Sequence, residues 1–279
     1  MLKVEKMVTM SPEQWEIVIE GMRNPHDSWD KIDSYMTHVE NAETGVTAPF
    51  EFFVGEADQK LMENLRDGGP VHAKYRRMMP IWMTITAPLY WWKEFDTYKI
   101  GVTTNSCSTM HRIHAKEFTR EDFSHEHLFG WNIPSSYNPE HDCFPQEETD
   151  GHEVLWASAD VLDLIIDALN FYRERFLETK NKKYWWQMIQ LLPTSYNQKR
   201  TVMITYEVVA NMRKWRWNHK QDEWRDLCQY LVDNLPYVEL TDEKDVVSEY
   251  KQKIEMLEKE LAEYKRKFKP TWDELRGEK

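Results

Sequence analysis

The 279-residue sequence predicts a mixed α+β protein, because helical and strand-like patterns both occur along the chain. A capping box at Ser11–Gln14, with Pro12 in the first helical position, precedes apolar residues at helical spacing. Segments 81–86 and 201–205 are rich in β-branched and apolar residues, which predicts two strands. The chain is 41% hydrophobic and 30% charged, as is typical of a globular protein with a large core.

Glycine and capping signals delimit further helices. Gly68-Gly69 should end one helix, and Ser158 should cap a long one. The segment 111–152 contains three prolines and is expected to be an irregular loop of the kind that often carries function. The apolar face of the helix after Ser158 is predicted to comprise Val161, Leu162, Ile165, Ile166 and Leu169. The other predicted helices cover 56–66, 89–98, 207–217 and 222–235.

The C-terminal segment has the clearest periodicity, and we predict a heptad-repeat helix in residues 241–279 after a main domain of residues 1–240. Apolar residues recur with 3-4 spacing over about three heptads, which is the lower limit for a coiled coil. An amphipathic helix packed on its own domain and a self-associating coiled coil both remain open. The apolar stripe consists of Val247, Tyr250, Ile254, Leu257, Leu261, Tyr264 and Phe268.

Charge and cysteine content argue against several classes of protein. The formal net charge of −12 argues against a protein that binds nucleic-acid polymers through an overall basic surface. Three cysteines without a C-x-x-C pair argue against a disulfide framework and for the cytoplasm. We expect no membrane association, because no signal-like segment and no run of eighteen apolar residues occur. The sequence also lacks the G-x-G-x-x-G, Walker A, G-x-S-x-G and H-E-x-x-H motifs.

A first patch of residues carries a family resemblance. Asn105 and Ser108, within Asn105-Ser106-Cys107-Ser108-Thr109-Met110-His111, match the end of a motif that reads Asn-Glu-x-Ser-x-Arg-Tyr. Upstream, Thr97-Tyr98-Lys99 lies where this motif begins with Arg-His-Arg. Only Lys99 keeps the positive charge of that tripeptide.

A second patch lies downstream, in the order and at the spacing of the same family. Leu192-Pro193 resembles its Leu-Pro segment, and Asn211 and Arg216 fit its Asn-x-x-x-x-Arg. The segment His219–Arg225 is similar to its His-Ala-Gln-x-Glu-Ile-Arg. Over about residues 7–235 the chain therefore resembles the flavin-dependent thymidylate synthases.

The resemblance implies an α+β fold around an antiparallel sheet with packed helices, in a homotetramer whose active sites lie between subunits. The family binds FAD, takes hydride from NADPH and methylates dUMP with methylenetetrahydrofolate, which implies a flavoenzyme acting on a pyrimidine deoxynucleotide. Ser108 would be catalytic, and Glu94, Ser108 and Arg216 would bind the substrate. The residues implied to bind FAD are His72, Lys99, Asn105, Asn211, Arg216 and His219.

Two departures from the family pattern support an alternative function. Met110 stands where the family has a phosphate-binding arginine, and Gln187–Gln190 supplies no cation where it has another. Hydrogen bonds to charged groups contribute about 1.5–3 kcal/mol each, so losing both arginines should weaken phosphate binding by several kcal/mol. The alternative is a catalytically inactive nucleotide- or flavin-binding or assembly protein. Ser108 would then either bind a phosphate or base edge or cap a turn.

A third hypothesis is a zinc-dependent protein organised by the histidine-rich segment. The spacings of its histidines and cysteines match no standard zinc site, so we expect loop residues rather than metal ligands. The residues concerned are Cys107, His111, His114, His125, His127, His141 and Cys143.

Overall fold

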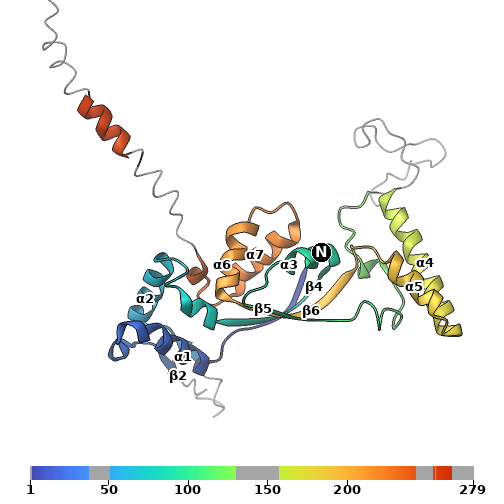
Figure 1. Cartoon of the computed structure of the whole chain (residues 1–279), viewed down its shortest axis with the longest axis horizontal. Helices are drawn as coiled ribbons and strands as arrows, with labels where there is room; N and C mark the ends of the chain where they lie inside the picture. The colour runs from blue at the N-terminus through green and yellow to red at the C-terminus, as the bar shows by residue number, and fades with distance from the viewer. Residues whose placement is uncertain (1, 38–50, 130–156, 243–253, 255, 266–279) are drawn as a thin grey trace, which may run out of the picture. The chain divides into compact units, whose positions relative to one another are not determined.

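The chain folds into a mixed arrangement of helices around an antiparallel sheet, which confirms the predicted α+β class (Figure 1). The computed structural model divides the chain into two units, Met1–Thr241 and Asp242–Lys279. The residues that it describes are 2–37, 51–129, 157–242, 254 and 256–265.

The main sheet of the first unit has four antiparallel strands in the order β1-β4-β6-β5. The two central strands pair along their whole length, with Ile81 opposite Ile204. On β4, Ile81, Met83 and Ile85 are buried while the residues between them are more exposed, so these three side chains share one face. The strands are β1 (Lys3–Val8), β4 (Pro80–Pro88), β6 (Asn197–Thr205) and β5 (Val102–Ser106).

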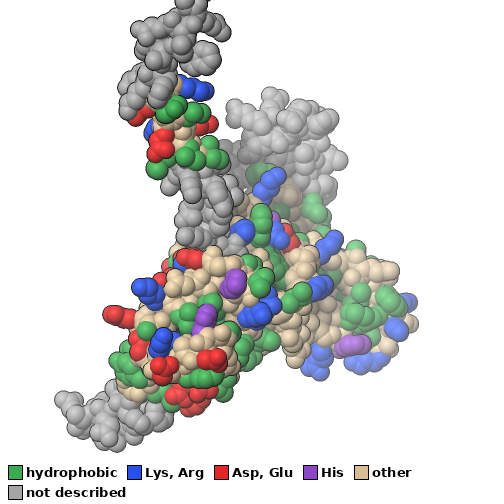
Figure 2. All heavy atoms as spheres, turned by 60° about the vertical axis from the view of Figure 1, so that its left-hand side comes forward, with side chains coloured by type: hydrophobic (Ala, Val, Ile, Leu, Met, Phe, Trp, Pro, Cys, Tyr) green, Lys and Arg blue, Asp and Glu red, His purple; other side chains and the backbone are tan. Residues whose placement is uncertain are grey.

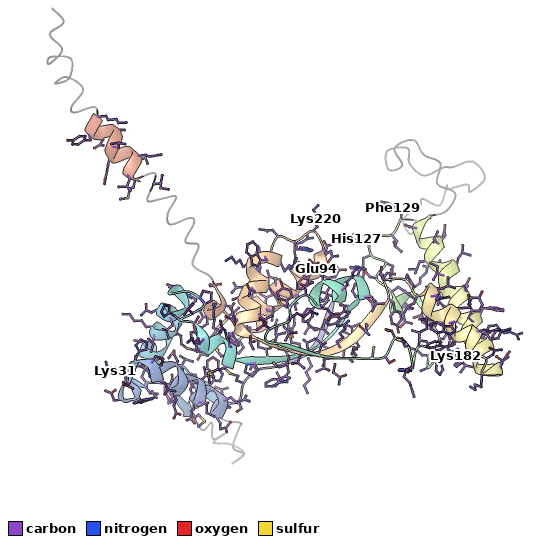
Figure 3. The ribbon with its side chains drawn as sticks, in the orientation of Figure 1. Lys31, Glu94, His127, Phe129, Lys182 and Lys220 are labelled. Atoms are coloured by element: carbon purple, nitrogen blue, oxygen red, sulfur yellow. The ribbon has the colours of Figure 1, made fainter. Side chains whose placement is uncertain are left out.

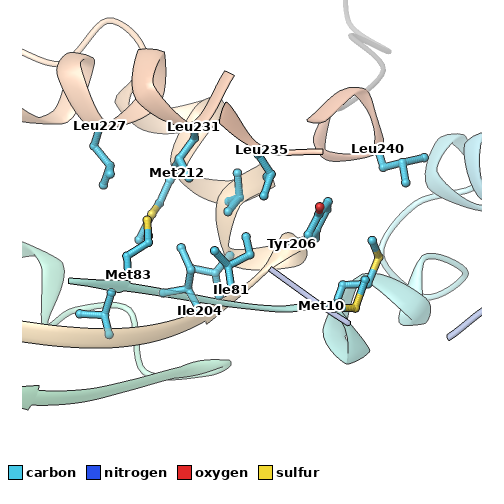
Figure 4. Packing of buried hydrophobic residues seen from close by; sticks show 14 of the residues in the cluster. Met10, Ile81, Met83, Ile204, Tyr206, Met212, Leu227, Leu231, Leu235 and Leu240 are labelled. Atoms are coloured by element: carbon cyan, nitrogen blue, oxygen red, sulfur yellow. The ribbon is translucent and has the colours of Figure 1, made fainter. Parts of the chain in front are cut away.

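Helices α6 and α7 cover the buried face of this sheet (Figure 4). Leu227 and Leu231 of α7 face the side chains of Met83 and Ile81, and all four are fully or almost fully buried. Burying such side chains contributes about 1.5–3 kcal/mol each, so this layer supplies much of the stability of the unit. A second sheet pairs β2 (Tyr35–Thr37) with β3 (Glu51–Phe53). The helices around the main core are α1 (Pro12–Arg23), α2 (Glu56–Asp67), α3 (Leu89–Phe95), α6 (Tyr206–Arg216) and α7 (Asp222–Asn234).

Most of the sequence-predicted elements of this core are confirmed. Ser11 caps α1 with the full capping box: Gln14 N–H donates to its hydroxyl, and its own N–H donates to the Gln14 side chain. The helices predicted over 56–66, 207–217 and 222–235 correspond to α2, α6 and α7. The helix predicted over 89–98 is shorter, because α3 ends at Phe95. Both predicted strands belong to longer ones, and β1, β2, β3, β5 and the helix α5 (Lys182–Leu191) were not predicted.

Helices α4 (Ser158–Thr179) and α5 (Lys182–Leu191) form a hairpin with a smaller core of its own. The prediction that Ser158 caps α4 is wrong: the N-cap residue is Ala157, and the Ser158 hydroxyl accepts the Phe129 N–H instead. Val161 is 41% exposed and lies off the buried face, which contradicts its predicted place there. The residues of this core include Ile113, Phe118, Phe123, Leu162, Ile166, Leu169 and Met188.

In the second unit, residues 256–265 are helical, within the segment predicted as a heptad-repeat helix. Val247, Tyr250 and Phe268 of the predicted stripe lie outside the described residues, so a coiled coil stays a prediction.

None of the helices that the structure describes is both long enough and apolar enough to cross a membrane.

Candidate functional site

The candidate site is a cluster of polar and aromatic side chains around Glu94. Strand β4 runs directly into α3, and Pro88 is the N-cap residue of that helix. The helix buries Trp91, Trp92 and Phe95 completely. Glu94 is thereby placed at the rim of an aromatic core, where its side chain is 27% exposed. A carboxylate in such a place requires hydrogen-bond or charged partners.

Three groups from α6, α7 and the turn between them converge on the Glu94 carboxylate, which lies close to both helices (Figure 3). Arg216 Nη1, at the end of α6, lies 2.5 Å from Oε1. Trp224 Nε1 donates to Oε2 over 2.9 Å. His219 Nε2 lies 3.3 Å from Oε1. The fold therefore brings together three residues to which the resemblance assigns ligands: Glu94, Arg216 and His219.

Aromatic rings fix the orientation of the Arg216 guanidinium. Its Nε donates to the Tyr98 hydroxyl over 3.1 Å, and its Cζ lies 4.9 Å from the centroid of the Trp224 ring. Burial raises the pKa of Tyr98, although the hydrogen bond from Arg216 opposes that shift. The phenol is therefore neutral at physiological pH. Arg216 is held by a carboxylate on one side and by π faces on the other.

A hydrogen bond in the turn before α7 fixes the tautomer of His219. The Gln221 backbone N–H donates to His219 Nδ1 over 3.2 Å. Because Nδ1 is the acceptor, the proton of the neutral ring is on Nε2, which lies 3.3 Å from Glu94 Oε1.

Two polar atoms beside this cluster have no hydrogen-bond partner in the described part of the chain. Gln221 Oε1 is a buried acceptor, and Trp91 Nε1 is a buried donor. The Trp91 ring centroid lies 4.7 Å from that of Trp224, and the Gln221 backbone N–H contacts His219, so both residues adjoin the cluster. An unpaired buried polar atom costs about 1–3 kcal/mol. Because Gln221 Oε1 is buried, a ligand N–H pairs with it only after the side chain turns outward, and that pairing would remove part of this cost.

The predicted catalytic Ser108 lies outside the cluster. Its Oγ accepts the backbone N–H groups of His111, over 2.8 Å, and Met110, over 3.3 Å. This geometry favours the turn-capping interpretation of the hydroxyl. Asn105 is exposed on β5, opposite Thr201. Within the described residues, no hydrogen bond or ion pair joins Ser108 or Asn105 to Glu94 or Arg216.

Three other predicted FAD-binding residues are exposed side chains at separate places. His72 follows α2 in a turn, Lys99 lies between α3 and β5, and Asn211 is on α6. None of these side chains forms a hydrogen bond or an ion pair with another described residue. Their end groups are therefore available to a ligand.

The zinc hypothesis receives no support from the residues that the structure describes, because they include no group of three metal-ligating side chains. The His114 ring packs edge-on against Phe176, and His127 Nε2 lies 3.1 Å from Asp222. Two of the residues considered, His141 and Cys143, lie outside the described segments.

Sequence reasoning assigned no role to three members of the cluster: Tyr98, Gln221 and Trp224. Tyr98 was noted only as a replacement within the Arg-His-Arg position. Gln221 and Trp224 stand within the matched segment His219–Arg225. The close spacing of Arg216, His219 and Trp224 in the sequence could have indicated that these three residues lie together. It could not indicate that they contact Glu94 of α3.

Comparison with solved structures identifies the type of fold. Two structures of the flavin-dependent thymidylate synthase ThyX from Helicobacter pylori, each with FAD and dUMP, are similar to this chain. The first has a TM-score of 0.51 at 15% identity, covering 86% of this chain and 97% of the enzyme chain. The second has a TM-score of 0.50 at 16% identity, with 86% and 96% covered. The chain thus has a flavin-dependent thymidylate synthase-like fold.

Sequence comparison adds nothing to this likeness. No protein-family model matches the chain, and no curated protein matches it significantly.

Proposed function

We propose that this chain is an FAD-binding protein of the flavin-dependent thymidylate synthase type, which converts dUMP to dTMP or performs a related reaction on a pyrimidine deoxynucleotide. The observation that carries the proposal is the convergence of Glu94, Arg216 and His219 beside the unpaired acceptor of Gln221. The two similar structures contain FAD and dUMP, which supports the same ligand classes for this fold.

The cluster has the donor and acceptor pattern that an imide ring requires. Uracil and the flavin ring both present an N–H between two carbonyl groups, and Gln221 Oε1 can accept that N–H. Arg216 Nη2 has no hydrogen-bond partner among the described residues, so it can donate to a ring carbonyl or a phosphate. Trp224 and Tyr98 flank the guanidinium and hold it in place for this contact.

Other exposed residues would contact the rest of an FAD molecule. A diphosphate requires cations or N–H donors, and the exposed Lys99 and His72 can supply them. Asn105 and Asn211 offer further donors and acceptors. Bound FAD would supply hydride transfer, with NADPH and methylenetetrahydrofolate as proposed co-substrates. The protein would act in the cytoplasm as a homotetramer, with sites completed between subunits.

A second candidate is a catalytically inactive flavin- or nucleotide-binding protein on the same fold. Two groups assigned to the substrate, Arg216 and the Ser108 hydroxyl, already have partners within the protein, and this observation favours the second candidate. Glu94 neutralises Arg216, and the Ser108 hydroxyl is occupied by two N–H groups of its own turn. A substrate phosphate would have to compete with a carboxylate for Arg216.

The test is titration of FAD into the purified full-length chain, followed by flavin fluorescence and visible absorbance. We expect about one FAD per chain. Arg216→Ala should weaken binding about tenfold, since it removes a charge-assisted hydrogen bond. The matched control is Lys220→Ala, which removes an exposed cation from the adjacent turn and should change little.

Turnover then separates the two candidates. Formation of dTMP from dUMP with NADPH and methylenetetrahydrofolate would establish the enzyme, whereas FAD binding without turnover would favour the inactive protein. Absence of FAD binding would contradict the enzyme, and absence of both FAD and dUMP binding would contradict the inactive binding protein as well. Light scattering should show a tetramer, and a monomer would contradict the proposed assembly.

A further inference from the structure

The α4–α5 tip, residues 173–186, concentrates positive charge on an acidic protein. Five cations and two carboxylates give this segment a formal charge of +3, whereas the chain carries −12. Lys180, Lys182 and Lys183 are exposed where the two helices meet. Figure 3 labels Lys182 at this end of the first unit, and Figure 2 shows Lys and Arg side chains around hydrophobic ones in the same region.

One cation from a second segment, Arg112, adds to this charge. The pKa of His114 is lowered by its burial and then by three cations, Arg112, Lys180 and Arg173. Arg173 Nε also donates to the His114 carbonyl over 3.2 Å. Residues 112–114 and the tip therefore form one positively charged surface. Its acidic members are few, and Glu178 is already paired with Arg175 over 3.0 Å.

Aromatic rings are interleaved with these cations. Lys182 Nζ lies 5.7 Å from the Trp185 ring centroid and 5.9 Å from that of Trp186. Lys183 Nζ lies 4.7 Å from the Tyr184 ring centroid. Trp186 is 45% exposed, so a ligand can reach its ring.

Contacts behind the rings hold them in fixed orientations. Trp185 Nε1 donates to the Met110 carbonyl over 2.9 Å, and the Tyr184 ring stacks on Tyr172. Trp186 packs edge-on against Trp185, with ring centroids 4.8 Å apart, so ordering the rings on binding costs little conformational entropy.

We propose that the α4–α5 tip binds single-stranded nucleic acid. Proteins that bind single strands combine cations that follow the phosphates with aromatic rings on which bases stack, and the tip presents both within one helical turn. The net charge of the whole chain argued against a generally basic surface, whereas this surface is local and of opposite sign.

An anionic membrane would also attract lysines, but the apex of the tip does not suit one. Lys180, Asn181, Lys182 and Lys183 form the apex, and all four are exposed and polar or charged. A membrane-inserting surface places apolar side chains foremost. In this hairpin the rings lie beside the apex, where an extended polymer can contact rings and lysines together.

The test uses fluorescein-labelled oligothymidylate and the full-length protein, with fluorescence anisotropy at low and at moderate salt. We expect binding that weakens as salt rises, because phosphate contacts release counterions. Lys182→Glu with Lys183→Glu should lower affinity by more than about tenfold. Trp186→Ala, which keeps every charge, should lower it about five- to tenfold through lost stacking.

The matched control is Lys31→Glu with Lys60→Glu, which makes the same charge change on exposed lysines outside the tip. It should leave affinity within about twofold. Equal losses in both double variants, or no loss in Trp186→Ala, would overturn the proposal. Binding to vesicles of phosphatidylcholine and phosphatidylserine but not to the oligonucleotide would overturn it in favour of a membrane. Absence of binding to either probe would overturn it outright.

Discussion

The tripeptide Tyr-Trp-Trp occurs twice in this chain, and the two copies lie in opposite environments. Tyr90-Trp91-Trp92 belongs to α3, and Tyr184-Trp185-Trp186 belongs to α5. The ring centroids of the two tryptophans are 4.8 Å apart in both copies, at interplanar angles of 74° and 70°. Trp91 and Trp92 are nevertheless fully buried, whereas Trp186 is 45% exposed. Local geometry is shared, and the tertiary surroundings decide what the rings do.

The difference follows from what packs against each helix. Trp224 of α7 packs on Trp91, and the Trp92 indole N–H donates to the Gln198 carbonyl of β6, so α3 is covered from two directions. Helix α5 packs on α4 and buries Met188. The tryptophan rings of α3 belong to the buried core next to the polar cluster around Glu94. In α5, Trp186 belongs to the protein surface.

The largest effect that would test this comparison is on stability. Trp91→Ala should lower the free energy of unfolding by about 3–5 kcal/mol, because it leaves a large cavity in the core. Trp186→Ala should lower it by about 1 kcal/mol or less, since the side chain is half in water already. Urea denaturation of both variants measures the difference, and equal losses would mean that the α5 rings are as buried in solution as those of α3.

The sequence predicted elements whose signals are local. The capping box of α1, the glycines that end α2 and the apolar spacing of α6 and α7 all lie within a few residues of the structure that they specify. Helix α3 was predictable because its bulky apolar residues occur consecutively, and Trp91, Trp92 and Phe95 are buried.

Elements whose stability comes from partners were missed. Strand β5 (Val102–Ser106) is short and largely exposed, and it is a strand because β6 pairs with it. Helix α5 has an aromatic-rich sequence, and Met188 is its one buried residue, which packs in the core shared with α4.

The candidate site shows the same limit. Its residues could be guessed one by one from motifs, but the contact of Glu94 with Arg216 spans 122 positions of the chain. Ser108 matched a motif letter, whereas its hydrogen bonds to His111 and Met110 depend on the turn that those residues form.

The second-largest expected effect is on the affinity for dUMP at the polar cluster around Glu94. Glu94→Gln should raise affinity for dUMP about tenfold, or about 1.4 kcal/mol, because Arg216 would no longer be neutralised and could bind phosphate bidentately. Deoxyuridine, which lacks the phosphate, should gain nothing. Calorimetric titration of both ligands into both proteins measures this. Equal weakening for both ligands would show instead that the Glu94 carboxylate contacts the pyrimidine ring itself.

The smallest effect is a titration that reports the charge of the α5 region. The pKa of His114 lies below its ordinary value because of burial and of Arg112, Lys180 and Arg173, and its buried Nδ1 has no partner among the described residues. Lys180→Gln should therefore raise this pKa, and salt should raise it in the unmodified chain.

A histidine whose pKa is lowered by folding favours the folded state above the ordinary pKa and loses that contribution as pH falls through the range between the two values. Stability should thus fall on acidification through the region just below pH 6.5, and less so in Lys180→Gln. Histidine chemical shifts followed across this pH range measure the pKa directly. If neither salt nor Lys180→Gln changes the pKa of His114, burial alone lowers that pKa. The α4–α5 tip would then lack the positive potential that distinguishes it from the buried α3 region.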